Sequence, residues 1–450
     1  MQASANISDS CDKECDVVIV GGGPAGSTAA ALLAERGYQV VLLEKAHHPR
    51  FHIGESLLPA NLPLLEKLGV AEQVKAIGME KWGAEFVSPC HSHKQSVEFA
   101  DAMDKSMPMA YQVRRSEFDE ILIKNASQKN ANVIEGCQAR EVEFLPNNTG
   151  VIVKVRFDDG TESKVRAHIL LDASGRDTFL GNRLKIKQKN KKHNSAAIYG
   201  HFSGAERNEG KSAGNITIFW FEHGWFWYIP LMDGTTSVGA TVWPYYLKTR
   251  GTKSLDTFLL ETIALCKPLQ ARLRGASLAT KAEATGNYSY SCKRSYGENY
   301  LLLGDAYAFI DPVFSSGVMM AMQSGFAAAD TVAVCLTDQK KMHKALKKYD
   351  NTMRVGPRVF SWFIYRVTNP VIRNMFMEPK NIFRVKEAVL SVLAGDVYGK
   401  TPITIPLFLF KVIYYIGSLF TLKRTIQSWK IRQNNENKTT QNKNKINQFQ

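Results

Sequence analysis

The sequence lacks the cysteine patterns that indicate a disulfide framework or a zinc site. Its seven cysteines are odd in number and scattered over 450 residues, and no pair has the spacing of zinc ligands. The first ten residues also lack the basic-then-apolar pattern of a secretory signal. We therefore expect reduced thiols, no bound metal and a cytoplasmic protein.

The sequence also lacks an unbroken apolar run long enough to predict a membrane span, and its most apolar segment is interrupted. Residues 402–422 are strongly apolar, but Pro402, Pro406 and Lys411 interrupt them. We expect a helix that packs on the rest of the protein here. The alternative, a helix that lies on a membrane surface, implies at most peripheral membrane contact.

Acidic residues are scarce at the C-terminal end. The whole chain has a net charge of +15, and from residue 401 onward eight Lys and Arg stand against the single acid Glu436. Such a basic tail can contact nucleic acid, anionic lipid or an acidic protein. Because residues 431–450 are mostly Asn, Gln and Lys, we expect a disordered, solvated polar tail and no nucleic-acid partner.

The clearest positive pattern lies near the N-terminus. A short apolar run at residues 16–20 is followed by Gly-Gly-Gly-Pro-Ala-Gly at residues 21–26 and a helical stretch to Arg36. A second apolar run, residues 39–43, ends at an acidic residue. This strand–turn–helix–strand order predicts a dinucleotide-binding unit.

Each residue of this unit has an expected role in cofactor binding. Gly21 permits the tight turn, and Gly23 lets the backbone approach a pyrophosphate. Gly26 allows close packing of helix on strand, and Ala25 lies in the same turn at the helix N-terminus, which favours negative charge. Glu44 can accept hydrogen bonds from ribose hydroxyls.

Two later segments distinguish FAD from a nicotinamide cofactor. Residues 169–176 and 301–306 are apolar strands that end in Ala-Ser-Gly-Arg and Gly-Asp-Ala. Both resemble the shared pattern of flavoprotein hydroxylases, which implies that Asp305 binds the ribityl chain of FAD. Arg115 resembles the family arginine near the flavin, although a surface arginine at a helix start is an alternative. The sequence has no second glycine-rich motif for a nicotinamide domain.

Strand-like segments lie between the flavin segments, and helical sequence follows residue 342. The predicted fold is α/β: a Rossmann-like FAD-binding domain of the flavoprotein hydroxylase type, an antiparallel sheet substrate domain and a helical C-terminal part. The four predicted strands are residues 196–202, 216–221, 225–231 and 237–243. The expected boundaries are 14–80, 111–180 and 285–341 for the FAD-binding domain, 81–110 and 181–284 for the substrate domain, 342–430 for the helical region and 431–450 for the tail.

Two tryptophans in the third of these strands constrain the chemistry. Trp225 and Trp227 are two residues apart, so a strand places both indoles on one face. Beside a reactive cofactor they would keep a substrate from reaching it directly. The alternative is an aromatic hairpin that merely packs a core.

Three motifs together make the chain resemble the flavin-dependent halogenases over nearly all of residues 14–430. Residues 225–230 (Trp-Phe-Trp-Tyr-Ile-Pro) match the family's WxWxIP, and residues 309–317 (Phe-Ile-Asp-Pro-Val-Phe-Ser-Ser-Gly) match its FxxPxxSxG. Lys81, in Glu-Lys-Trp-Gly-Ala, lies where phenol and pyrrole halogenases carry their catalytic lysine. An ordinary surface lysine is the alternative for Lys81.

The resemblance implies reduced FAD, O₂ and chloride or bromide as reactants, with hypohalous acid formed at the flavin and guided to the substrate by Lys81. Backbone amides in the FxxPxxSxG loop would hold the halide, although the same residues could simply cap the following helix. Gly54 and its neighbours resemble the family's flavin-side loop. The implied halide-binding residues are Pro312, Ser316 and Gly317, and the flavin-loop residues are Glu55 and Ser56.

One position departs from the halogenases of free tryptophan, which carry a glutamate inside this loop. Phe314 occupies that place here and cannot accept a proton. The resemblance therefore implies a phenolic or pyrrolic ring as substrate, either free or tethered to a carrier protein, and a separate reductase that supplies FADH₂. Glu222 and His223 are candidate acid–base helpers, but we expect both to be turn residues that face solvent.

Three other functions remain open. A flavoprotein hydroxylase or epoxidase needs its substrate close to the flavin, which Trp225 and Trp227 should prevent. A prenyl-chain reductase would suit the apolar residues 402–422, but reduction requires neither Lys81 nor the tryptophans. A non-catalytic flavin-binding protein is the third alternative. Labelled halide in the product separates halogenation from all three.

Overall fold

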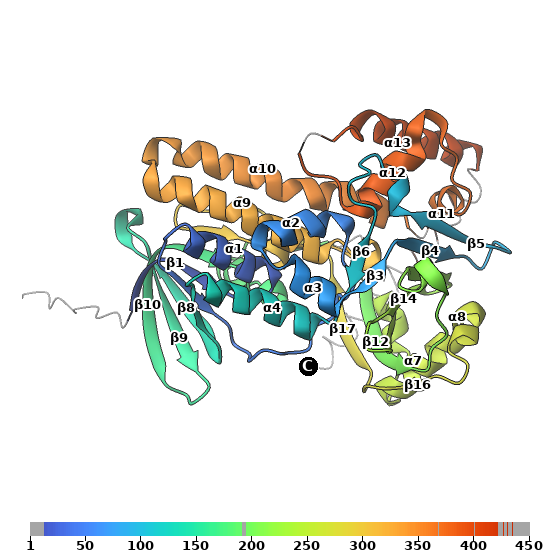
Figure 1. Cartoon of the computed structure of the whole chain (residues 1–450), viewed down its shortest axis with the longest axis horizontal. Coiled ribbons are helices and arrows are strands. Elements are labelled where there is room, and N and C mark those ends of the chain that lie inside the picture. Colours follow the sequence, from blue (N-terminus) through green and yellow to red (C-terminus); the bar gives the residue numbers. More distant parts are fainter. Residues whose placement is uncertain are drawn as a thin grey trace, which may run out of the picture.

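The computed structural model describes residues 13–190, 195–367, 369–399 and 401–421, together with positions 426, 430 and 434. The N-terminal leader and almost all of the predicted polar tail lie outside the described residues. Figure 1 shows two large sheets side by side, with a group of C-terminal helices above the second sheet.

The first sheet is the dinucleotide-binding sheet predicted from the sequence. Its strands follow the order β7-β2-β1-β10-β9-β8, and β19 pairs with β10. Strands β7, β2, β1, β10 and β19 run parallel, whereas β9 and β8 form an antiparallel extension. The strands are β1 (Lys13–Val20), β2 (Val40–Leu43), β7 (Asn132–Ile134), β8 (Cys137–Phe144), β9 (Val151–Phe157), β10 (Glu162–Asp172) and β19 (Tyr300–Leu302).

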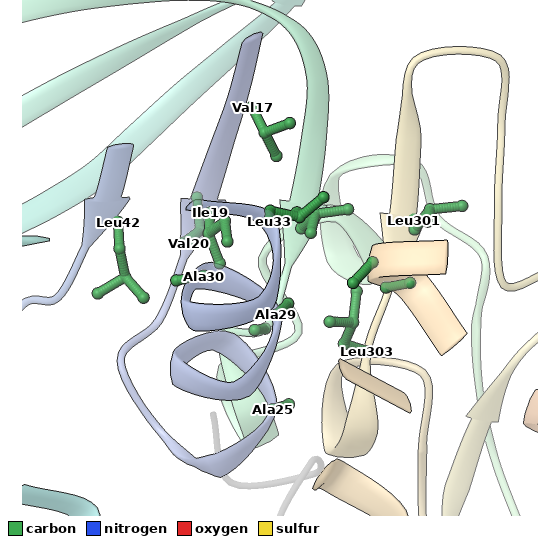
Figure 2. Close-up of a cluster of buried hydrophobic side chains, with 14 of the residues drawn as sticks. Val17, Ile19, Val20, Ala25, Ala29, Ala30, Leu33, Leu42, Leu301 and Leu303 are labelled. Carbon is green, nitrogen blue, oxygen red and sulfur yellow. The ribbon is translucent and has the colours of Figure 1, made fainter. Parts of the chain in front are cut away.

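Apolar helices pack against this sheet because small residues let them come close. Helix α1 (Pro24–Glu35) is almost entirely buried and contacts α4 (Arg115–Gln128) and α9 (Gly317–Thr337). Figure 2 shows β1 side chains such as Ile19 and the α1 side chains Ala29 and Leu33 in one cluster with Leu301 from β19. By length and composition α9 could cross a membrane, but more than half of its most apolar part is buried, and it packs against α1 and α10 (Gln339–Ile364).

The second sheet has eight strands in the order β16-β12-β15-β14-β13-β4-β5, with β17 paired to β12. Its pairs are antiparallel except for β13 beside β4. All four predicted strands are found, with bounds shifted by one residue at most. The strands are β4 (Gly83–Val87), β5 (Lys94–Glu98), β12 (Ser195–Ser203), β13 (Ile216–Phe221), β14 (Gly224–Pro230), β15 (Thr236–Val242), β16 (Ser277–Leu278) and β17 (Glu283–Tyr288).

Smaller sheets and short helices surround the two large sheets. Two small sheets pair β3 with β6 and join β11, β18 and β20. Their strands are β3 (Met79–Lys81), β6 (Ala110–Gln112), β11 (Lys187–Lys189), β18 (Tyr290–Cys292) and β20 (Ala308–Phe309). The short helices are α2 (Leu62–Leu68), α3 (Ala71–Ile77), α5 (Phe179–Arg183), α6 (Pro244–Lys248), α7 (Leu255–Ala264) and α8 (Lys267–Arg272).

Alternation along β14 divides the second sheet into two apolar faces. Trp225 and Trp227 lie in one core cluster with residues of the C-terminal helices, whereas Phe226 and Tyr228 belong to a second cluster with α7. The helices that cover the tryptophan face are the distal half of α10, α11 (Pro370–Met377), α12 (Val385–Ala394) and α13 (Thr404–Phe420). The predicted fold class, including its helical C-terminal part, is therefore confirmed. The expected domain boundaries stay a prediction.

Close packing of α1 on β1 depends on Gly26. A Cβ atom at this position would lie 1.9 Å from the carbonyl oxygen of Gly21, and that backbone cannot move without opening the turn. We expect Gly26→Ala to lower the free energy of unfolding by about 1–3 kcal/mol and to abolish FAD retention. Thermal unfolding and flavin absorbance of the purified protein measure both. Gly286→Ala is the control, because a Cβ there meets nothing within 4 Å. Wild-type stability and FAD content in Gly26→Ala would contradict this account.

Candidate active site

The turn between β1 and α1 has the shape of a phosphate cradle. Gly21 has a φ of +108°, and a Cβ there would lie 2.4 Å from the carbonyl oxygen of Ala173. Gly23 precedes the first residue of α1, and the nearest atom to a Cβ built on it is an Arg50 guanidinium nitrogen at 3.8 Å. The helix N-terminus is therefore open to an anion, which fits the pyrophosphate of FAD.

Glu44 closes the same turn from the end of β2. Its Oε2 accepts a hydrogen bond from the Gly22 amide at 2.7 Å, and its Oε1 accepts one from the Ala46 amide at 2.9 Å. The carboxylate is buried, so it fixes the glycine turn in position. A contact with ribose hydroxyls stays a prediction.

Asp305 lies in the short 3-10 turn at residues 304–306, which follows β19. Loss of hydration raises the pKa of its carboxyl to about 6, although the positive charges of Arg176 and Arg115 act in the opposite direction. A Cβ built on the neighbouring Gly304 would lie 3.2 Å from the Cβ of Ala321 in α9 and 3.4 Å from the Cβ of Ala25 in α1. Helix α1 and the Asp305 turn therefore meet at the first turn of α1.

Arg115 is buried at the start of α4, which excludes the alternative of a surface arginine. Its guanidinium donates to both carboxylate oxygens of Asp119, at 2.8 and 3.0 Å, and to the carbonyl oxygens of Ile53 and Gly54. Burial raises the pKa of Asp119, but the charge and hydrogen bonds of Arg115, together with the nearby His52 and Arg50, outweigh burial and hold the pKa below its usual value. Arg115 thus anchors the loop that carries Gly54.

Glu55 and His201 form a buried pair that the sequence did not reveal. His201 Nε2 lies 2.8 Å from Glu55 Oε1, and both side chains are almost completely buried. The other carboxylate oxygen, Oε2, has no hydrogen-bond partner among the described residues. A buried carboxylate oxygen without a donor is costly, so this atom fits a donor on a bound cofactor. The available signal for His201 was a lone histidine in the apolar strand at residues 196–202.

Ser56, the next residue, contacts Lys81 instead. The Lys81 ammonium donates to Ser56 Oγ at 2.9 Å and to the Leu57 carbonyl oxygen at 3.0 Å. It also lies 5.1 Å from the centre of the Phe99 ring. The side chain is 1% exposed, which excludes an ordinary surface lysine, and burial lowers its pKa to about 7.

Trp225 and Trp227 lie side by side on the face of β14 that meets the C-terminal helices. Their ring centres are 5.9 Å apart, and the Trp227 indole donates to Ser237 Oγ at 3.2 Å. Gly239 makes space for this indole, because a Cβ there would come within 2.3 Å of it. Their cluster also contains Val313 from the predicted halide loop. The indoles thus belong to the same apolar core cluster as a residue of that loop.

The predicted halide loop holds unused backbone donors. Asp311 accepts from the Val313 amide and from the Ser195 hydroxyl, and Pro312 begins the short turn that follows. Ser316 precedes α9, but its side chain makes no capping hydrogen bond. Among the described residues, neither the Ser316 amide nor the Gly317 amide donates a hydrogen bond. Space beside Gly317 is open as well, because a Cβ there meets nothing within 4 Å.

Phe314 is held in an aromatic cluster rather than presented as a reactive group. Its ring centre lies 5.9 Å from that of Phe363 and 6.3 Å from that of Phe376. Glu222 is exposed in the turn before β14, as expected, whereas His223 is half-buried and its ring stacks on that of Tyr246 at 4.3 Å. The described geometry gives Glu222 and His223 no contact with Lys81.

The buried Lys81 should make stability depend on pH. Its folded-state pKa of about 7 lies below the ordinary value of 10.5, so the unfolded chain binds more protons between these values. The free energy of unfolding should therefore rise from pH 7 to 10 for the wild type and rise less for Lys81→Met. Urea unfolding at several pH values measures both slopes, with the exposed Lys75→Met as control. Equal slopes for wild type and Lys81→Met would contradict the burial of this amine.

Comparison with known proteins identifies the family. Residues 14–357 match the FAD binding domain family. The chain is 31% identical to a 1H-pyrrole-2-carbonyl-[peptidyl-carrier protein] chlorinase of Pseudomonas fluorescens, over 86% of this chain and 90% of that protein. It is 35% identical to a tryptophan 2-halogenase of Chondromyces crocatus over 74% of this chain, but spans only 64% of that relative.

Solved structures agree with the sequence matches. The myxobacterial chondrochloren halogenase CndH superposes with a TM-score of 0.76 and 30% identity, over 87% of this chain and 92% of that one. A flavoprotein/dehydrogenase from Cytophaga hutchinsonii superposes with a TM-score of 0.80 and 27% identity, over 90% and 100%. The chain contains an FAD-binding domain and belongs to the flavin-dependent halogenase family.

Proposed function

We propose that the protein chlorinates or brominates an electron-rich phenolic or pyrrolic ring and uses Lys81 to direct hypohalous acid to it. Bound FADH₂, together with O₂ and the halide, would supply that oxidant. The single observation that carries the proposal is a buried amine with a pKa of about 7, held by the residue next to the predicted flavin contact Glu55. A separate reductase would supply FADH₂.

The halide would bind at the N-terminus of α9. The free amides of Ser316 and Gly317 can donate to a dehydrated anion, and the aligned peptide dipoles of the helix favour negative charge there. Pro312 begins the turn that presents these amides. Because the Ser316 hydroxyl makes no capping bond, helix capping alone does not account for this sequence.

The two indoles would separate the flavin from the organic substrate. Trp225 and Trp227 share one apolar cluster with Val313 of the halide loop and with Leu58, which follows the loop that binds Lys81. A wall of two indoles would admit a species as small as hypohalous acid and exclude an aromatic ring. Direct oxygen transfer, as in a hydroxylase, needs the ring beside the flavin and is disfavoured.

Lys81 would then act on the small oxidant. With a pKa near 7, a large share of the amine is neutral at physiological pH and can attack halogen. Attack on hypohalous acid forms an N–halogen bond and releases water, whereas the protonated amine donates a hydrogen bond to the same oxidant. Ser56 and the Leu57 carbonyl hold the nitrogen in one place, which fixes the direction of transfer.

Phe314 supports the choice of substrate. A phenol or pyrrole is activated by its own heteroatom, so its ring needs less help from a carboxylate at this position. The name of the pyrrolyl chlorinase relative indicates a pyrrole tethered to a carrier protein, whereas the name of the tryptophan halogenase relative indicates an indole substrate. We propose a phenolic or pyrrolic substrate, free or presented by a carrier protein.

Halide incorporation tests the proposal directly. The enzyme, FAD, a flavin reductase and isotope-labelled chloride or bromide are incubated with phenols and pyrroles, free and carrier-loaded, and products are identified by mass spectrometry. We expect labelled halide in the product, and an approximately 100-fold or greater loss of rate in Lys81→Ala with FAD still bound. FAD content is followed by absorbance.

Lys94→Ala is the matched control, because this lysine is exposed on β5 and should leave the rate unchanged. Retained halogenation in Lys81→Ala would remove Lys81 from the mechanism. A product that gains oxygen but no halogen would identify a hydroxylase, and a product that gains only hydrogen would identify a reductase.

A further inference from the structure

Among the described residues, helix α13 packs against the protein on one side only. Leu407, Phe410 and Tyr414 are buried against the protein, at the spacing of one helix face. The opposite side is apolar and exposed, and the turn at residues 382–384, which packs against α13, extends it. We name this the C-terminal apolar face, and its members are Ile382, Phe383, Ile405, Phe408, Leu419 and Phe420.

The exposure of these side chains is unusually high for large apolar groups. Phe408 is 63% exposed, Leu419 is 69% exposed and Phe420 is 87% exposed. Single exposed apolar residues need no explanation, but a contiguous patch on one helix indicates a surface that is covered in use. Figure 1 shows α13 at the outer edge of the molecule, above the second sheet.

A basic and aromatic fringe borders this face. The Arg366 guanidinium lies 4.5 Å from the Trp362 ring centre and donates to the Tyr415 hydroxyl at 3.2 Å. The Lys411 ammonium lies 5.3 Å from the same tryptophan ring, and its pKa is lowered by burial and also by the positive charges of Arg366 and Arg358. Tryptophan, tyrosine, lysine and arginine at the edge of an apolar surface are typical of the membrane–water interface.

The sequence charge around the face points the same way. Residues 401–421 contain no acidic residue, and residues 401–450 carry a net charge of +7. A partner therefore has to be anionic or apolar at this surface. An anionic lipid surface supplies both properties, because basic residues near it are attracted while apolar side chains enter the acyl boundary.

Geometry distinguishes a surface helix from the other possible occupants. Seventeen residues make a helix of about 25 Å, shorter than a typical bilayer span, and α13 is tied to the protein by its buried side. The exposed members of the face offer no polar group that could fix the register of a protein partner, whereas specific protein interfaces carry hydrogen bonds. A fluid lipid surface needs no such register.

We propose that α13 lies on an anionic lipid bilayer, with the C-terminal apolar face at the acyl boundary and with Arg358, Arg366 and Lys411 at the level of the phosphates. This inference rests on the C-terminal helices and is independent of the proposed chemistry.

Vesicle co-sedimentation tests the proposal with the full-length, FAD-loaded protein. We expect binding to vesicles of phosphatidylcholine mixed with phosphatidylglycerol, weaker binding to phosphatidylcholine alone and loss of binding at high salt. In Phe408→Glu/Leu419→Glu/Phe420→Glu the partition coefficient should fall about 100-fold or more. Thermal unfolding and FAD absorbance establish that this variant is folded.

The matched control carries the same three charges elsewhere. Met232→Glu/Leu260→Glu/Leu265→Glu changes side chains that are 60%, 50% and 56% exposed around the second sheet, and it should bind vesicles within about three-fold of the wild type. Wild-type protein that stays in the supernatant with anionic vesicles overturns the proposal, whatever the variants do. Equal binding by the two triple variants overturns it as well. Dimers that only the α13 variant loses, without vesicle binding, would show that a second copy covers the face instead.

Discussion

The burial of one ammonium group constrains the whole site. Lys81 is removed from water, and its nitrogen is held by the Ser56 hydroxyl and the Leu57 carbonyl. Neither group carries a charge that would compensate for the lost hydration, so the amine titrates near neutral pH. A buried amine of this kind destabilises the fold when it is charged, and such groups are most common at functional sites.

The loop at residues 53–57 connects this amine to the cofactor side. Arg115 holds the carbonyl groups of Ile53 and Gly54, Glu55 points to His201, and Ser56 points to Lys81. Two successive residues of this loop thus serve both sides of the site: Glu55 is a proposed flavin contact, and Ser56 holds the proposed catalytic amine. A shift of this loop would move both together, which makes His201 a positioning residue for Glu55 in our account.

Much of the fold follows from local patterns, and the contacts inside the site do not. Glycine spacing and apolar runs predict the dinucleotide-binding sheet and the four strands of the second sheet, and alternation along β14 predicts that Trp225 and Trp227 share a face. The burial of Lys81 cannot be derived from its polar neighbour Glu80. It arises because β3 pairs with β6 and meets a loop 25 residues away in sequence.

The Glu55–His201 pair is a second contact that local sequence patterns do not predict. The strand of His201 follows from the sequence, but its partner Glu55 is 146 residues away, and no local pattern indicates such a pair. The cofactor contact of Arg115 stays a prediction, and the structure adds that its nitrogen donors hold Asp119 and two loop carbonyls. Long-range contacts of this kind decide which polar residues of a motif face a ligand and which support the residues that do.

In our account the organic substrate does not contact the flavin, and a small halogenating species carries the halogen to that substrate. Anomalous diffraction from crystals that contain FAD and bromide can locate the halide and the flavin relative to the indoles. Our account predicts a bromide peak at hydrogen-bond distance from the amides of Ser316 and Gly317, with the indoles of Trp225 and Trp227 between the isoalloxazine ring and the nitrogen of Lys81. A flavin ring in direct contact with Lys81, or indoles directed away from the flavin, would contradict it.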